Sequence, residues 1–178
     1  MRPYTAADTL RIAKRYNNPK RSYLLVNPLQ AKHIPVSPTA ALEMMSALGG
    51  QVAARYPEAR LLIGFPETAT AVGAAVAAQR GGECVYLPTT REPLDGDWIL
   101  FQEEHSHAVE HQLSAEHLEE WIDRSPAVVF VDDEFSTGRT LINMVRQLRE
   151  RYPRLAERQL AAASLLCRVS PGNLRQLA

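Results

Sequence analysis

The chain has 178 residues, the usual length of one domain, and its 20 basic and 20 acidic residues leave no net charge. A neutral chain argues against a broad nucleic-acid-binding face, which needs a basic surface. No apolar run approaches the about 20 residues of a membrane span, and the N-terminus lacks the apolar stretch of a signal peptide, so we expect a cytoplasmic protein that binds neither nucleic acid nor membranes.

The first third of the chain predicts two helices around a short strand. Thr5 can cap a helix that runs to about Tyr16, where Asn17-Asn18-Pro19 ends it. An apolar run at 22–26 indicates a strand, and three prolines at 27–38 indicate an irregular connection. Ser37-Pro38 is typical of a helix start, which predicts a helix over 39–55.

The rest of the chain alternates short apolar strands with helices. This alternation predicts an α/β fold, in which a parallel sheet with right-handed crossovers carries helices on both faces. Ligands of such folds bind at the carboxyl ends of the strands. Neither a Gly-x-Gly-x-x-Gly nor a P-loop motif is present, which argues against dinucleotide binding and P-loop ATPases. The expected strands are 60–65, 83–87, 127–131 and 160–167, and the expected helices are 70–79, 115–122 and 140–152.

The segment 127–140 carries the strongest functional signal. An apolar strand is followed by Asp132 and Asp133 and then by a turn rich in hydroxyl groups, Ser136-Thr137-Gly138-Arg139-Thr140. Backbone amides at a helix N-terminus hold a phosphate, and the hydroxyl groups add donors. The carboxylates can accept hydrogen bonds from sugar hydroxyls or help to hold a divalent cation. The pattern therefore predicts a site for a phosphorylated sugar.

This segment resembles the phosphoribosyl pyrophosphate motif of type I phosphoribosyltransferases. The resemblance implies a single domain, 1–178, with an N-terminal hood at about 1–37 and a core at about 38–167. It also implies a homodimer and Mg²⁺ as cofactor. Asp132 and Asp133 would bind the ribose 2- and 3-hydroxyls of the Mg-bound donor and help to hold the metal. The 5-phosphate would be wrapped by Ser136, Thr137, Gly138, Arg139 and Thr140.

A second strand, turn and helix spans 61–73. Gly64 permits tight backbone geometry, and the turn offers hydroxyl groups and free amides at the helix start. The corresponding turn of type I phosphoribosyltransferases holds pyrophosphate and often contains a cis peptide. The resemblance assigns this role to Glu67, Thr68, Ala69 and Thr70. An ordinary helix capped by Thr68 explains the same residues equally well.

A long polar segment, 88–112, is too long for a simple connection, and such segments are commonly lids. By resemblance it is a loop that closes over the donor, with Arg91 on the pyrophosphate. His105 and His107 are catalytic candidates that meet pyrophosphate or donate a proton. Together with His111 they also permit a zinc site, or they are simply exposed loop histidines.

Taken together, four motifs, 32–35, 64–70, 104–108 and 132–138, look closest to one subgroup. These are the orotate-phosphoribosyltransferase-like proteins encoded in tellurium-resistance-type bacterial gene clusters. By resemblance Lys32 and His33 lie in the hood over the acceptor, although a surface turn is equally consistent. We expect an enzyme that moves 5-phosphoribosyl between Mg-bound phosphoribosyl pyrophosphate and a nitrogen base. A non-catalytic donor-binding regulator is the alternative, and a metal-dependent phosphohydrolase is a weaker one.

Overall fold

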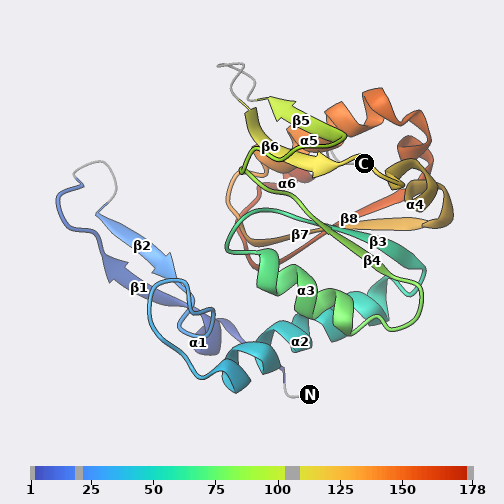
Figure 1. Ribbon diagram of the computed structural model, residues 1–178. Coiled ribbons are helices and arrows are strands. Elements are labelled where there is room, and N and C mark those ends of the chain that lie inside the picture. Colours follow the sequence, from blue (N-terminus) through green and yellow to red (C-terminus); the bar gives the residue numbers. More distant parts are fainter. Residues whose placement is uncertain (1–2, 19–21, 103–108, 176–178) are drawn as a thin grey trace.

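A four-stranded parallel sheet forms the centre of the computed structural model, which describes residues 3–18, 22–102 and 109–175 (Figure 1). The strand order is β4-β3-β7-β8. The strands are β3 (Ala59–Gly64), β4 (Val85–Pro88), β7 (Ala127–Phe135) and β8 (Gln159–Cys167). The apolar runs of β3 and β7 are nearly continuous because both faces of a parallel sheet are covered.

Helices cover both faces of this sheet, as the alternation of elements predicts. On one face, α2 (Pro38–Arg55) and α3 (Thr70–Ala78) pack against Leu62, Val129 and Val131. On the other, α4 (Leu118–Arg124) and α5 (Arg139–Arg151) pack against Ile63 and Phe130. Each fully buried side chain of this kind contributes about 1.5–3 kcal/mol. A 3₁₀ helix, η1 (Pro153–Glu157), and α6 (Pro171–Leu174) flank β8.

The expected helix over residues 5–16 is wrong. Only α1 (Ala6–Thr9) is helical, and it is followed by β1 (Arg11–Lys14), which pairs antiparallel with β2 (Tyr23–Val26). The segment has no apolar stripe of helical period, so nothing holds a long helix on the core. Pairing of Ile12 with Leu25 across the two strands takes its place.

The expectation of a long loop at 88–112 is also corrected for the residues that the structure describes. A second antiparallel pair, β5 (Trp98–Gln102) and β6 (Val109–Ser114), lies over the face of the sheet that α4 and α5 cover (Figure 1). Ile99, Phe101 and Leu113 are buried in the core there. In β5 the buried residues flank the exposed Leu100, which is the period of a strand, and their burial holds the β5–β6 pair on the core.

Strand β7 is longer than expected and ends at Phe135, not at residue 131. It continues because β8 continues beside it, with Asp132 opposite Ser164 and Glu134 opposite Leu166. The two acids of the motif therefore lie in the strand itself. Within the described ranges, no helix is both long enough and apolar enough to cross a membrane.

Candidate functional site

Two turns meet at the carboxyl edge of the sheet. The first follows β3 and leads into α3, and the second follows β7 and leads into α5. Because β3 and β7 are parallel neighbours, both helices begin at the same edge. The Thr68 hydroxyl in the first turn donates a 2.8 Å hydrogen bond to Asp133 Oδ1 at the end of β7. The fold thus joins two motifs that lie 65 residues apart in sequence.

The first turn contains a cis peptide between Pro66 and Glu67. A cis peptide in this turn is a feature that the family resemblance implies. Glu67, Thr68 and Thr70 are exposed, whereas Ala69 is fully buried. Ala69, not Thr68, is the residue before the helix, and no side chain caps α3. The simple alternative of a helix capped by Thr68 is therefore wrong, because the hydroxyl group of Thr68 is directed to Asp133.

Tyr86 of β4 packs against this turn and holds it by a hydrogen bond. Its hydroxyl group donates a 3.2 Å hydrogen bond to the carbonyl of Thr70. A Cβ atom added to Gly64 would lie 2.3 Å from the Tyr86 hydroxyl, and one added to Gly73 would lie 2.5 Å from the ring. The glycines at the end of β3 and in α3 therefore make room for this aromatic ring, and burial raises the pKa of Tyr86 to about 12.

The two acids have different surroundings although they are adjacent. Asp133 is buried, and its Oδ2 lies 2.7 Å from the ammonium of Lys32. Burial opposes its ionisation, but hydrogen bonds from Lys32 and Thr68 and the positive charge of Lys32 outweigh burial and lower the pKa of Asp133 to about 2. Burial, followed by the negative charge of Asp133, raises the pKa of Asp132 to about 7. The pair therefore keeps one permanent carboxylate and one that titrates near neutrality.

The second turn exposes Ser136, Thr137 and Arg139 around a glycine in a left-handed conformation, Gly138 with φ 78°. Gly138 precedes α5 directly. Asn173 of α6 donates a 2.8 Å hydrogen bond from Nδ2 to the carbonyl of Thr137. The sequence does not indicate a role for Asn173 in this turn. Its position after Ser170-Pro171, a helix start, indicates a structured C-terminus but not this contact.

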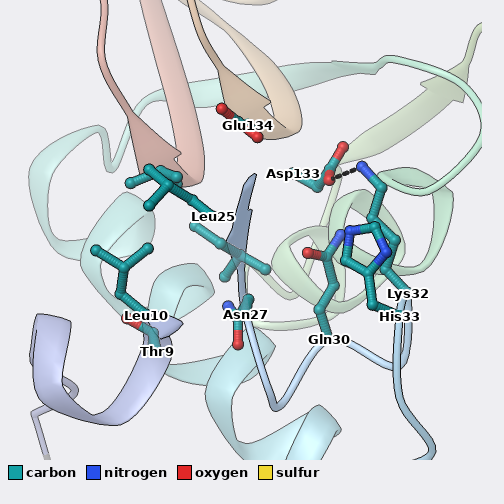
Figure 2. A pocket seen from close by; sticks show the side chains of 11 residues that line it. Thr9, Leu10, Leu25, Asn27, Gln30, Lys32, His33, Asp133 and Glu134 are labelled. Atoms are coloured by element: carbon teal, nitrogen blue, oxygen red, sulfur yellow. Dashed lines mark hydrogen bonds and ion pairs between the residues drawn. The ribbon is translucent and has the colours of Figure 1, made fainter. Parts of the chain in front are cut away.

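The hood contributes Lys32 and His33 through the connection that follows β2. The Asn27 side chain holds the start of this connection, because its Oδ1 accepts a 2.9 Å hydrogen bond from the Leu29 amide. Figure 2 shows Lys32 reaching Asp133 across a pocket whose lining also includes His33 and Gln30. The pocket has room for about 20 Å³, which is about one water molecule. Lys32 therefore closes the space beside Asp133, and Gln30 is a further residue that sequence analysis missed.

The remaining candidates lie elsewhere. Arg91 is exposed and follows β4, whose carboxyl end shares the sheet edge with β3. His105 and His107 lie outside the described residues. His111 is buried in β6, where its ring meets that of Phe65 edge to face, so it is not an exposed loop histidine. Among the described residues, no group of three or more His, Cys, Asp or Glu side chains is arranged to hold a metal ion by itself.

Comparison with known proteins agrees with this geometry. The profile of a family described as "Phosphoribosyl transferase" matches residues 9–176. The structure is similar to the adenine phosphoribosyltransferase of Rhodothermus marinus, with 15% identity, a TM-score of 0.58, and coverage of 93% of this chain and 90% of that one.

Two further structures are similar in fold. The adenine phosphoribosyltransferase of Trypanosoma brucei, solved with AMP, pyrophosphate and ribose-5-phosphate, has 14% identity, a TM-score of 0.57, and coverage of 93% of this chain and 80% of that one. The enzyme of Leishmania donovani has 17% identity, a TM-score of 0.56, and coverage of 94% and 81%. At such identities the likeness shows a shared fold. Among curated proteins, no sequence matches this chain.

Proposed function

This chain belongs to the phosphoribosyl transferase family, and we propose that it transfers 5-phosphoribosyl from Mg-bound phosphoribosyl pyrophosphate to a nitrogen base. The hydrogen bond between Thr68 and Asp133 carries the proposal. It joins the turn at 67–70, which would bind pyrophosphate, to the acid pair that would bind the ribose. The motif-based relationship to the orotate-phosphoribosyltransferase-like proteins of tellurium-resistance-type clusters, and assembly as a homodimer, are further proposals.

Each part of the donor has a place at this edge of the sheet. Ser136, Thr137, Gly138, Arg139 and Thr140 hold the 5-phosphate, because α5 begins there with free amides and the positive end of its dipole. Asp132 and Asp133 accept hydrogen bonds from the ribose hydroxyls. Glu67, Thr68, Ala69 and Thr70 bind the pyrophosphate at the start of α3. Fixing both ends of the donor positions its anomeric carbon for attack by the base.

The two carboxylates also fit Mg²⁺. Magnesium is commonly held by one or two carboxylates together with substrate phosphates, and Asp132 and Asp133 supply that number. The bound metal would take up negative charge on the departing pyrophosphate. Arg91 would add positive charge from its place after β4. His105 and His107 are proposed to meet the pyrophosphate or donate a proton.

Calorimetry with phosphoribosyl pyrophosphate and Mg²⁺ tests this function. We expect binding that EDTA removes and that Asp132→Asn/Asp133→Asn weakens at least about a hundredfold, since each charged hydrogen bond contributes about 1.5–3 kcal/mol. Glu116→Gln/Glu119→Gln is the matched control, because it removes two exposed acids near the start of α4. Equal binding by the two double variants would contradict the proposal.

A further inference from the structure

A second cavity lies beside the closed pocket, between the hood and the end of the sheet. It has a volume of about 480 Å³, within the range of small-molecule sites. Its lining includes the cations Arg15, Lys32 and Arg168, the carboxylate of Glu134, and the side chains of Tyr23 and Leu25. Figure 2 shows Lys32, His33, Glu134 and Leu25, the four residues that line both spaces.

The charges in this cavity do not balance. Glu134 is already neutralised, because Arg168 donates to it from Nε at 3.1 Å and also from its terminal nitrogen. The charge of Lys32 is matched by Asp133. Arg15 is exposed at the rim, and within the described ranges no acidic side chain pairs with it. The cavity therefore has an excess of positive charge even before a substrate binds.

Engagement of Asp133 by Mg²⁺ would release part of the charge of Lys32 to this cavity. Asp133 is the partner of Lys32, and it is also one of the two acids that the ribose hydroxyls and Mg²⁺ engage in the proposed function. When the donor occupies Asp133, the ammonium of Lys32 loses its closest partner. Lys32 already lines the cavity, so its charge then faces the same space as that of Arg15.

From this arrangement we infer that the acceptor is a heteroaromatic base that carries a carboxylate, an inference that rests on the proposed function. Arg15 and Lys32 bind the carboxylate, since a guanidinium matches the two oxygens of a carboxylate in one plane. Tyr23 and Leu25 provide apolar surface for the flat ring. Glu134, held by Arg168, accepts a hydrogen bond from a ring N–H group.

Two matched pairs of bases test the inference by calorimetry: nicotinate against nicotinamide, and orotate against uracil. The protein is saturated with Mg²⁺, ribose 5-phosphate and pyrophosphate. These fill the donor site but cannot react, because the anomeric carbon carries no pyrophosphate leaving group. We expect the acid of at least one pair to bind about tenfold or more tightly than its neutral partner, because only the acid offers a carboxylate to Arg15 and Lys32 and charge-assisted hydrogen bonds are the stronger ones.

Variants identify the residues responsible. Arg15→Gln should weaken binding of the acid about tenfold, and far more than binding of the neutral base, whereas Arg15→Lys should restore only part of the affinity, because an ammonium lacks the planar pair of donors. Lys32→Gln should also weaken binding of the acid more than that of the neutral base, and its donor affinity is measured alongside because Lys32 contacts Asp133. Lys14→Gln is the matched control, because Lys14 is an exposed cation next to Arg15 that does not line the cavity. Its affinity for the acid should equal that of the unmodified protein.

Equal or tighter binding of the neutral base in both pairs would overturn the inference, as would the absence of binding by both acids. An equal loss in Arg15→Gln and Lys14→Gln would overturn it too, because it would indicate only general attraction to a basic surface. A separate titration with phosphoribosyl pyrophosphate and Mg²⁺ distinguishes failure of the proposed acceptor class from failure of the proposed function. If this donor binds while the acids show no preference, the acceptor class is wrong and the phosphoribosyl transfer stands.

Discussion

Asp132 and Asp133 are adjacent in sequence, but their pKa values differ because their contacts differ. Asp133 receives hydrogen bonds from Lys32 and Thr68, which come from two other segments of the chain, and its pKa falls to about 2. Asp132 is half-buried beside that fixed charge, and its pKa rises to about 7. A Mg²⁺ ion held by the pair would add positive charge next to Asp132, so metal binding should draw Asp132 into its ionised form.

The raised pKa of Asp132 predicts a dependence of stability on pH. The folded state retains the proton up to about pH 7, whereas the unfolded chain loses it near the ordinary pKa of an aspartate, 3.8. The contribution of this proton to the free energy of unfolding is fully present below pH 3.8 and is lost as the pH rises through about 7. Asp132→Asn keeps the uncharged form, so it should stabilise the protein at pH 8 by about 4 kcal/mol and by little at pH 4.

Urea unfolding of both proteins at the two pH values measures this difference. Asp95→Asn, which removes an exposed acid, is the control and should follow the unmodified protein. Parallel stability curves for Asp132→Asn and the unmodified protein would show that Asp132 ionises normally in the folded state.

At the scale of elements, the phosphate turn is held by the segment that follows β8. The Arg168 amide donates to the carbonyl of Phe135 at 2.8 Å, Val169 packs on Gly138, and Asn173 donates to the carbonyl of Thr137. These contacts run along the whole turn before α5. The C-terminal segment is therefore part of the support for the proposed 5-phosphate site.

Removing the Asn173 contact should loosen the turn without unfolding the protein. We expect Asn173→Ala to weaken donor binding about fivefold, since one hydrogen bond contributes about 1 kcal/mol. Asn173→Asp, which has the same shape but no N–H donor, should lose as much. Arg175→Ala, at the exposed end of α6, is the control. Calorimetry with the donor measures the affinities, and unchanged affinity in both Asn173 variants would contradict a supporting role.

Helix α3 and strand β4 are fitted to each other through Gly73 and Tyr86. Alanine usually stabilises a helix by about 1 kcal/mol relative to glycine. Here the added methyl group would lie 2.5 Å from the Tyr86 ring, and such overpacking costs about 1–3 kcal/mol. Gly73→Ala should therefore destabilise the protein, but in a Tyr86→Ala background it should be neutral or stabilising. Thermal unfolding of the four proteins measures the coupling, and additive effects would contradict it.

For the whole molecule, the site is assembled from parts that are distant in sequence. Lys32 comes from the hood, Thr68 from the turn after β3 and Asp133 from β7. Figure 1 shows β1 and β2 as a separate pair beside the sheet, joined to it through the segment that precedes α2. A ligand bound between hood and sheet would tie these parts together.

Donor binding should consequently raise the thermal stability of the whole chain. At a donor concentration about 100 times the Kd, the folded state gains about 2.7 kcal/mol, which corresponds to an increase in Tm of about 5–10 °C for a chain of this size. Phosphoribosyl pyrophosphate without Mg²⁺, or with EDTA added, should give a much smaller increase. Differential scanning fluorimetry measures it, and an increase that does not depend on Mg²⁺ would contradict a metal-bound donor.

The sequence by itself determined the parallel sheet, most of its helices and the positions of both turns. The strands at the sheet centre are apolar on both faces, and Asp132-Asp133 followed by Ser136–Thr140 is a dense local pattern, so neighbouring residues alone carry these signals. The apolar run at 22–26 predicted β2, but β1 and the β5–β6 pair escaped prediction because each of these strands depends on a partner across the pair and has little local preference.

Only the tertiary structure decided how the site residues meet. The contact of Lys32 with Asp133 joins residues 101 positions apart, and that of Asn173 with Thr137 joins residues 36 apart. The different ionisation of two adjacent aspartates depends on these contacts, because burial and hydrogen bonds, not residue type, determine a pKa in a folded protein. No local pattern in a sequence specifies which distant side chain will complete such a contact.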